Sequence, residues 1–289
     1  MKTKIKNIFL IILSLMSVFP LVACNGNTLS YEAFITDASL SGSGVDYQIE
    51  KNIYKTEEKN DPSVPKTVTL NINGYTLEGA YSHSEKIFPN IFYKHFYYSA
   101  DRSYDFSLDD SGQLLTLFIS EGSGKLDTET KKELSEEECL AIAKDFILKT
   151  VSAKVDLEEY TVNEVKELED RYKFEFKKYI NGFATMDGAH VGVLKSGHVY
   201  SYTSTMFGKI SANDMPKLDH EKIIQTIETK LDTLYRDVKG NYVSIDYEEI
   251  EYYFTPLEDG KPAVYCIVSI RFDHGNGGSH GEMVSMLIT

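Results

Sequence analysis

The stretch SGHVYSYTS, residues 196–204, decides the fold because the chain repeats its pattern twice. A glycine and then a strand-like run also occur in SGQLLTLFIS (111–120) and in HGEMVSMLIT (280–289). The glycines of the three copies lie 85 and 84 residues apart, at Gly112, Gly197 and Gly281. Constant spacing of this kind is typical of repeated structural units. We therefore expect each copy to be the last strand of one unit.

Two segments of helical period follow the first two copies. LSEEECLAIAKDFILKTV (134–151) has Ser135 as N-cap and Glu138 three residues later, which is the pattern of a capping box. LDHEKIIQTIETKLDTLY (218–235) has the same apolar period, with Asp219 as N-cap. We expect helices over 135–150 and 219–236. Their inward residues should be Cys139, Ile142, Ala143, Phe146 and Ile147 in the first helix, and Ile223, Ile227 and Leu231 in the second.

Strands fill the remainder of each unit. In YKFEFKKYI (172–180), aromatic residues alternate with charged ones, as in an antiparallel strand with one buried face. The turn 109–112 ends in a glycine, which suits a hairpin that needs positive φ. We therefore expect an α+β fold of tandem modules, each a helix packed on a three- to four-stranded antiparallel sheet. The expected units are 45–133, which is β-rich and lacks the leading helix, 134–217 and 218–289.

The N-terminus predicts export and a lipid anchor. Three lysines precede an apolar run over 8–19 that is too short to span a bilayer. LVAC (21–24) resembles the lipobox of bacterial lipoproteins, which implies cleavage before Cys24 and lipidation of its sulfur. We expect a signal peptide over 1–23, a linker over 24–44, and an extracytoplasmic protein held on the bacterial surface or envelope by the lipid alone. The alternative is an ordinary secreted protein.

The net charge narrows the range of ligands. The chain has 30 basic and 44 acidic residues, a net charge of −14. Loss of three signal-peptide lysines leaves 27 basic residues and a net charge of −17. This charge argues against nucleic acid and anionic lipid as ligands.

Besides Cys24 there are only Cys139 and Cys266, which occupy apolar positions in different units, so we expect both to be free and buried.

Residues 134–204 resemble the PepSY superfamily, and more closely its YcdB/YcdC-like repeats. The resemblance is carried by SEEECLAIAKDFI, RYKFEFKKYINGF and DGAHVGVLKSGHVYSYTS. The third unit is similar through LDHEKIIQTIETKL and DGKPAVYCIVSI, and the first only through its final hairpin. The resemblance implies exported, non-catalytic modules associated with peptidase control or with envelope proteins. It implies no particular site residues.

The sequence contains no motif of a known enzyme class. The loop DHGNGGSHGE (273–282) holds His274, His280 and Glu282, side chains of the kind that bind metal. It lacks the spacing of known metal motifs, and a long glycine-rich hairpin loop explains it equally well. No nucleophile elbow and no phosphate-binding glycine loop is present. We therefore expect no enzymatic activity, no cofactor and no bound metal.

Two tyrosine-rich segments are the candidate binding surfaces. The candidate residues are Tyr93, Tyr97, Tyr98, Tyr252 and Tyr253. Exposed tyrosines on a sheet suit peptide or sugar ligands, whereas buried ones would fill the core between modules. We expect a non-enzymatic, surface-tethered lipoprotein that binds a protein or peptide, including a secreted peptidase that it restrains. The alternatives are a metal-dependent hydrolase that uses the His274/His280 loop and a glycan-binding structural component of the envelope.

Overall fold

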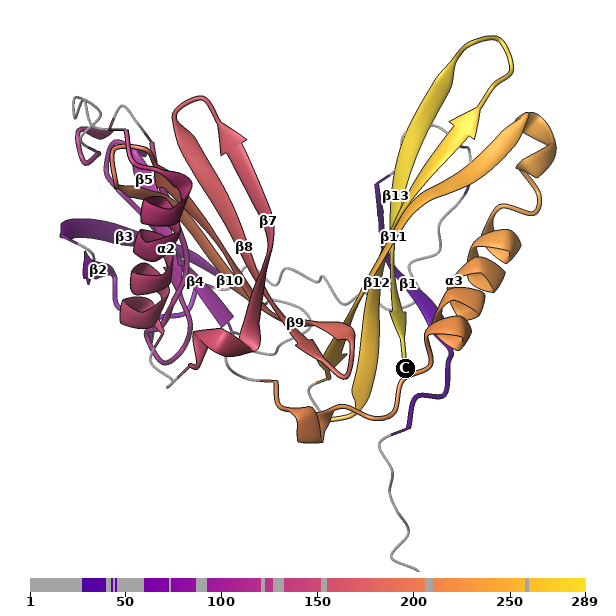
Figure 1. The fold of residues 1–289 in the computed structure, drawn as a ribbon, viewed down its shortest axis with the longest axis horizontal. Coiled ribbons are helices and arrows are strands. Elements are labelled where there is room, and N and C mark those ends of the chain that lie inside the picture. The colour runs from indigo at the N-terminus through magenta and orange to yellow at the C-terminus, as the bar shows by residue number, and fades with distance from the viewer. Residues whose placement is uncertain are drawn as a thin grey trace, which may run out of the picture.

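The computed structural model describes residues 28–39, 43, 45, 60–72, 74–86, 93–120, 123–126, 133–151, 155–205, 210–257 and 260–289. The expected signal peptide and Cys24 lie outside these residues. The described part is an α+β fold with two α-helices and a large mixed sheet (Figure 1). None of its helices is both long enough and apolar enough to cross a membrane.

The sheet contains thirteen strands, and most connections between them are hairpins. The strands are β1 (Ala33–Ser39), β2 (Thr67–Ile72), β3 (Tyr75–Lys86), β4 (Tyr93–Tyr98), β5 (Tyr104–Leu108), β6 (Leu114–Ile119), β7 (Tyr160–Leu168), β8 (Arg171–Ile180), β9 (Phe183–Leu194), β10 (Val199–Thr205), β11 (Ser244–Pro256), β12 (Pro262–Asp273) and β13 (Ser279–Ile288). The helices are α2 (Glu136–Thr150) and α3 (His220–Leu234), and short 3-10 turns are η2 (Leu157–Glu159), η3 (Ala212–Asp214) and η4 (Lys239–Asn241).

The strands form two arms that meet near the start of β9. The pairing order is β1-β13-β12-β11-β9-β10-β6-β5-β4-β3-β2, and β7 and β8 branch from β9. All pairs are antiparallel except β11 with β9, which are joined by one parallel pair, Phe254 with Thr185. Figure 1 shows one arm with α2 and the strands from β2 to β10, and the other with α3, β1 and β11 to β13. A single pair is a narrow connection between the two arms.

The expected division into three small sheets differs from the structure. The strands of the expected first unit continue into the second unit's sheet, because β6 pairs with β10 over Ser201–Thr203. One hydrophobic core contains Leu77 and Phe106 from the first range together with Phe146 and Tyr202 from the second. A sheet must bury its apolar face against another layer. Since no described helix belongs to β2–β6, these strands complete their core with the neighbouring unit.

The expected linker also differs in part. Residues 33–39 form β1, which pairs antiparallel with β13 from Ala33↔Ile288 to Ser39↔Met283. The backbone N–H of Ser30 donates to the carbonyl of Thr289 at 2.9 Å and extends this contact. The strand covers β13, which would otherwise be a free edge.

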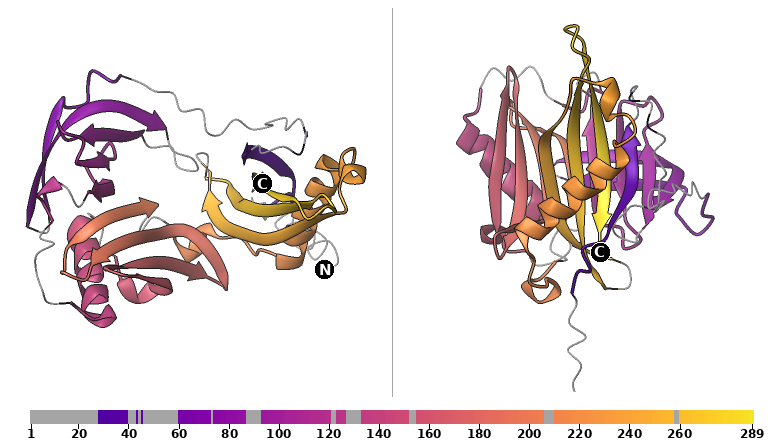
Figure 2. Two further views of the ribbon diagram at one scale, coloured as in Figure 1. Left: turned by 90° about the horizontal axis from the view of Figure 1, so that it is seen from above. Right: turned by 90° about the vertical axis from the view of Figure 1, so that its right-hand side faces the viewer.

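The two helices agree with the sequence expectation. At α2, Ser135 Oγ accepts from the Glu138 N–H at 3.3 Å, and Glu138 Oε2 accepts from the Ser135 N–H at 2.9 Å. The buried residues of α2 are Cys139, Ala143, Phe146 and Ile147, with Ile142 partly buried beside them. At α3, Asp219 Oδ1 caps the helix, and Ile223, Ile227 and Leu231 are fully buried. Figure 2 shows α3 lying across one face of the β11–β13 sheet.

The repeated strands are β6, β10 and β13, but their turns are not equivalent. Gly112 and Gly197 have φ of 81° and 94°, as a turn glycine should. Gly281 instead lies within β13, opposite Arg271. The positive φ angles of this third hairpin occur at Gly275 and Gly277. The longer loop therefore moves the turn toward the N-terminus while the strand keeps its place.

Candidate binding groove

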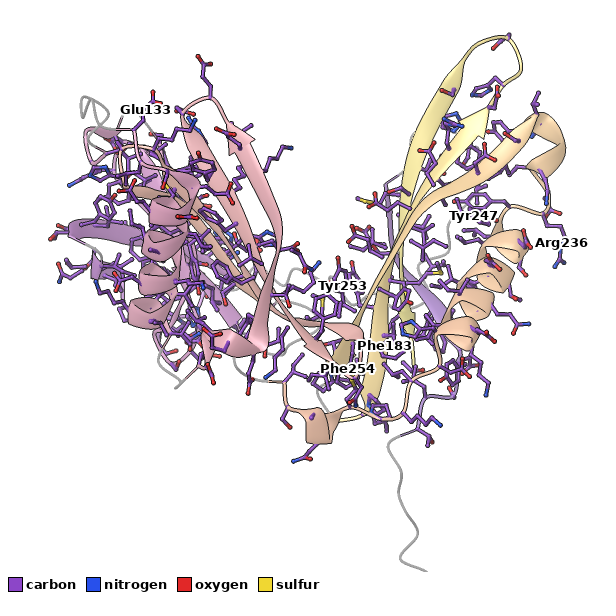
Figure 3. The ribbon with its side chains drawn as sticks, viewed as in Figure 1. Glu133, Phe183, Arg236, Tyr247, Tyr253 and Phe254 are labelled. Carbon is purple, nitrogen blue, oxygen red and sulfur yellow. The ribbon has the colours of Figure 1, made fainter. Side chains whose placement is uncertain are left out.

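An open groove of about 310 Å³ lies where the two arms meet. It is lined by the β8–β9 hairpin, by the first residue of α3 and by four consecutive residues of β11. The lining residues are Lys177, Tyr179, Gly182, Phe183 and Ala184 from the hairpin, His220 from α3, and Ile250, Glu251, Tyr252 and Tyr253 from β11. Figure 3 shows Phe183, Tyr253 and Phe254 close to the junction of the arms.

A tight turn positions the hairpin side of the groove. Asn181 and Gly182 have φ of 52° and 84°, and Ile180 pairs with Phe183 across them. Two central residues with positive φ define the Asn-Gly hairpin turn whose twist matches that of the flanking strands. The turn places Tyr179 and Phe183 on either side of the bend. Phe183 is 6% exposed and Tyr179 is 43% exposed, so one ring anchors the hairpin and the other is open to solvent.

Stacked rings form the floor of the groove. The Phe183 and His220 rings are 3.7 Å apart with 9° between their planes. His220 Nδ1 is hydrogen-bonded to the Tyr252 hydroxyl at 2.5 Å, and the Tyr252 ring lies 6.4 Å from that of Phe183. Phe183 is nearly buried, so it holds the more exposed rings of His220 and Tyr252 in place, and these offer contact area that loses little conformational freedom when a ligand binds.

The groove lining also contains the charged residues Lys177 and Glu251, and Glu175 contacts Lys177. Lys177 Nζ is 4.8 Å from the Tyr253 ring centroid and 2.9 Å from Glu175 Oε1. The Tyr253 hydroxyl donates a hydrogen bond to the Glu251 carboxylate. Burial, followed by that hydrogen bond and the negative charge of Glu251, raises the pKa of Tyr253. The phenol therefore stays protonated at neutral pH.

The five tyrosines singled out from the sequence do not form one site. Tyr252 and Tyr253 line the groove. Tyr97 is 1% exposed and stacks on Phe106 with ring centroids 5.3 Å apart, so it belongs to the core. Tyr98 is half-buried beneath the Arg102 guanidinium, 4.0 Å from its ring centroid. Tyr93 is half-buried at the start of β4, with its N–H 3.4 Å from Asp110 Oδ2.

Strand alternation explains this division. Residues 93, 95 and 97 share one face of β4, and 98 lies on the other, so a tyrosine-rich strand cannot present all its rings together. The sequence-based prediction missed Lys177, Tyr179, Phe183 and His220. Only the Asn181-Gly182 turn signals a hairpin there, and nothing in the sequence brings that hairpin to β11.

The side chains of the histidine loop (273–282) contact one another and neighbouring residues. His274 Nε2 and His280 Nδ1 are hydrogen-bonded at 2.8 Å, and the His280 ring stacks on Phe272 at 4.6 Å and 3°. Glu282 Oε1 accepts from the Ser43 N–H at 2.8 Å and lies 3.7 Å from His280 Nε2. In the described ranges, no group of three or more His, Cys, Asp or Glu side chains is arranged to hold a metal ion.

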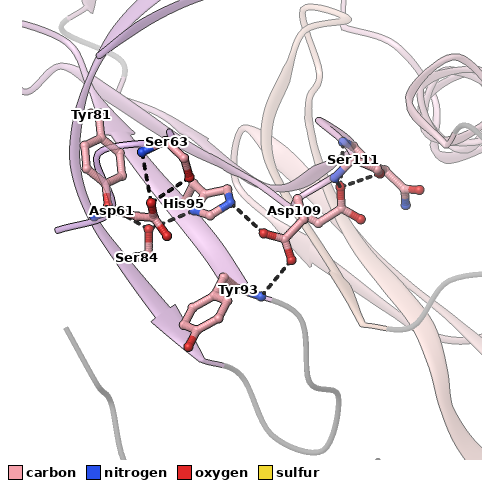
Figure 4. A network of polar contacts seen from close by, with 10 residues as sticks. Asp61, Ser63, Tyr81, Ser84, Tyr93, His95, Asp109 and Ser111 are labelled. Carbon is pink, nitrogen blue, oxygen red and sulfur yellow. Dashed lines mark hydrogen bonds and ion pairs between the residues drawn. The ribbon is translucent and has the colours of Figure 1, made fainter. Parts of the chain in front are cut away.

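A serine, a histidine and an aspartate form a network that the sequence pattern did not indicate (Figure 4). Ser84 Oγ is 2.8 Å from His95 Nδ1, and His95 Nε2 is 3.1 Å from Asp110 Oδ1. Serine hydrolases use the two nitrogens in the opposite order, and they expose the serine to substrate. Ser84 is 1% exposed and also contacts the Tyr81 hydroxyl at 2.7 Å. The network connects β3, β4 and the β5–β6 turn.

One part of the chain is similar to a known family. Residues 94–206 match the family model described as the YcdB, YcdC repeated domain. None of the curated proteins matches the chain. Among solved structures, the YpeB C-terminal domain of Bacillus megaterium is similar at a TM-score of 0.32 and 14% identity, over 71% of this chain and 88% of that one. The family match begins within β4 and ends one residue after β10, so it includes α2 and strands on both sides of it.

Proposed function

We propose that this protein is a non-enzymatic binding module that takes up a protein or peptide segment in the groove between the arms. The observation that carries the proposal is the ring arrangement of Phe183, His220 and Tyr252, with Tyr179 exposed beside it. Concave sites with fixed aromatic walls and a few polar groups are typical of ligand binding. The lining contains binding groups of both charges, Lys177 and Glu251.

The same proposal includes a lipid anchor and an architecture of tandem modules. Lipidation at Cys24 would hold the protein on the outer side of a membrane. Two separate hydrophobic cores, one beneath α2 and one beneath α3, support a description as tandem helix-on-sheet modules. Cys139, Ala143 and Ile147 in α2 have the same spacing as the fully buried residues of α3.

A secreted peptidase that the protein restrains is the target class we propose, and the negative net charge favours a target with a basic surface.

A displayed library of random linear peptides tests the binding proposal. Enriched peptides are measured against the purified protein by fluorescence anisotropy. Tyr179→Ala and Tyr253→Ala should each weaken binding about tenfold, since aromatic side chains in a groove dominate peptide affinity. Phe118→Ala is the matched control, because its ring is 49% exposed and lies outside the groove.

Two results would count against the proposal. One is that no enriched peptide binds the purified protein. The other is that binding is equally sensitive to Phe118→Ala and to the groove variants. Cell-wall glycan fragments serve as a second set of ligands in the same assay. Binding of glycan alone, unchanged by Tyr179→Ala and Tyr253→Ala, would favour the structural envelope role instead.

A further inference from the structure

One long edge of β11 borders the groove. On one side, β11 pairs with β12 from Ser244↔Asp273 to Pro256↔Pro262. On its other side, the described residues provide only the pair of Phe254 with Thr185. A strand edge of this kind presents backbone donors and acceptors to an added strand.

The edge and the groove form one surface. Four consecutive residues of β11, from Ile250 to Tyr253, line the groove. They immediately precede Phe254, where the contact with β9 occurs. An extended chain that paired with β11 here would therefore pass directly into the groove, with Phe183 and Tyr179 beside it.

The two faces of β11 differ in chemistry. Glu249 and Glu251 are exposed, lie opposite Ser269 and Ile267 of β12, and share one face. Ile250 and Tyr252 lie on the other face, against the core beneath α3.

Arg271 of β12 forms ion pairs with two other carboxylates of β11, Asp246 and Glu248. Arg271 Nη1 is 3.0 Å from Glu248 Oε1, and its Nη2 is 3.7 Å from Asp246 Oδ2. The contact of Glu251 is with a neutral phenol. The face of Glu249 and Glu251 therefore keeps negative charge for a basic ligand to meet.

We infer that the ligand is an extended peptide segment that adds as a strand to β11 and alternates basic with apolar side chains. Side chains of neighbouring strands lie on matching faces, so lysine or arginine residues would meet Glu249 and Glu251. The intervening apolar side chains would lie on the side of Ile250, Tyr252 and Phe183. The inference rests on the proposed function, because it names the ligand class of that groove.

A second copy of the chain is disfavoured on the same edge. Two β11 strands pairing with each other would bring acidic side chains together, and like charges opposite each other destabilise strand pairing. Charges on an edge also protect a protein from unwanted pairing. A direct binding test distinguishes this protective role from recognition of a basic peptide.

The probe is the fluorophore-labelled peptide Lys-Val-Lys-Val-Lys-Val-Lys amide, measured by anisotropy against the full chain. Its counterpart with Glu in place of Lys should not bind. Two N-methylated versions of the lysine peptide are also measured. The first carries backbone N-methyl groups on its lysines, and the second carries them on its valines. Alternate N–H groups of a strand point to opposite edges, so one copy should lose binding and the other keep it. This asymmetry is the signature of strand addition.

Protein variants test the charge component. Glu249→Gln combined with Glu251→Gln should weaken binding of the lysine peptide about tenfold and reduce its salt dependence. The control combines Glu78→Gln with Glu137→Gln, two exposed carboxylates on β3 and α2 with the same change in charge, and should not alter binding. All four positions are exposed, and circular dichroism checks that both variants fold.

The outcomes separate this inference from the proposed function. Equal binding of both N-methylated copies, or equal effects of the two double variants, overturns strand addition by a basic segment. Strand addition is also overturned if the lysine peptide fails to bind while library peptides still depend on Tyr179 and Tyr253, and then the proposed function stands. If neither the probe nor any library peptide binds, both fail.

Discussion

The ring of Phe183 in β9 lies parallel to the imidazole of His220 in α3, with their centroids 3.7 Å apart and 9° between their planes. This contact joins a hairpin of one arm to the helix of the other. β9 and β11 share only one residue pair, and the stack adds to the packing of Ile180, Phe183 and Met186 in the core beneath α3. The same two rings form the floor of the candidate groove.

We predict that this stack stabilises the fold. In a double-mutant cycle with Phe183→Leu and His220→Ala, the coupling free energy should be about 0.5–1.5 kcal/mol, the range for paired rings beyond their burial. Urea denaturation of the four proteins measures it. Additive effects of the two substitutions would show that the rings are merely adjacent.

Close packing at Gly79 should make that position intolerant of a side chain. A Cβ there would lie 2.7 Å from Tyr97 Cβ and 2.8 Å from Phe106 Cε1. Gly79→Ala should lower the free energy of unfolding by about 1–3 kcal/mol, because neither core ring can move freely. Gly240→Ala is the matched control, since its added Cβ has no atom within 4 Å, and it should change stability by less than about 0.5 kcal/mol. Equal effects of the two substitutions in urea denaturation would contradict the packing argument.

Asp101 should titrate well below an ordinary aspartate. Hydrogen bonds from the Ser103 side chain and N–H, and from the Ser99 hydroxyl, lower the pKa of Asp101 to about 2. Its contribution to stability is therefore fully present above the unfolded-state pKa of about 3.9 and is lost as the pH falls through about 2. NMR titration of the carboxyl carbon measures the midpoint. Asp101→Asn should remove this acid-dependent contribution, and a midpoint near 4 in the wild type would exclude the hydrogen-bond effect.

The two internal cysteines are free and buried, as the sequence predicted. Burial raises the pKa of both thiols, with the charge of Glu138 adding to the effect at Cys139. Neither should react with a maleimide at neutral pH in the folded protein, because the thiolate is the reactive form. Both should react in denaturant without reductant, as shown by mass spectrometry of the Cys139 and Cys266 peptides. Rapid labelling in the native state would indicate that a core opens easily.

Lipidation of Cys24 stays a prediction. Cys24→Ala should release the protein from the membrane fraction of expressing cells, because a lipid chain on that sulfur is the expected anchor. Cys139→Ala is the control and should leave fractionation unchanged. Membrane association that persists in Cys24→Ala, as measured by immunoblotting of the separated fractions, would reject the anchor.

Local signals in the sequence predicted several elements correctly. The Ser135–Glu138 capping box and the Asp219 cap place the starts of both helices, because a cap involves residues only a few positions apart. The buried faces of α2, α3 and β8 follow from period alone. The same period could not say which tyrosines are exposed, since both faces of β4 carry rings and the neighbouring layer decides which are covered.

The sequence by itself determined the helices, their caps and the positive-φ turn at Gly112, because each depends on neighbouring residues, and the repeat spacing determined the three closing strands. Only the tertiary structure decided that β6 continues into β10, that β1 covers β13, and that β11 meets the β8–β9 hairpin. Every strand edge offers the same backbone groups, so local sequence does not choose among partners far apart in the chain. The groove combines residues of β8 and β9 with others of β11 some seventy positions later, and only the packing of the two arms brings them together.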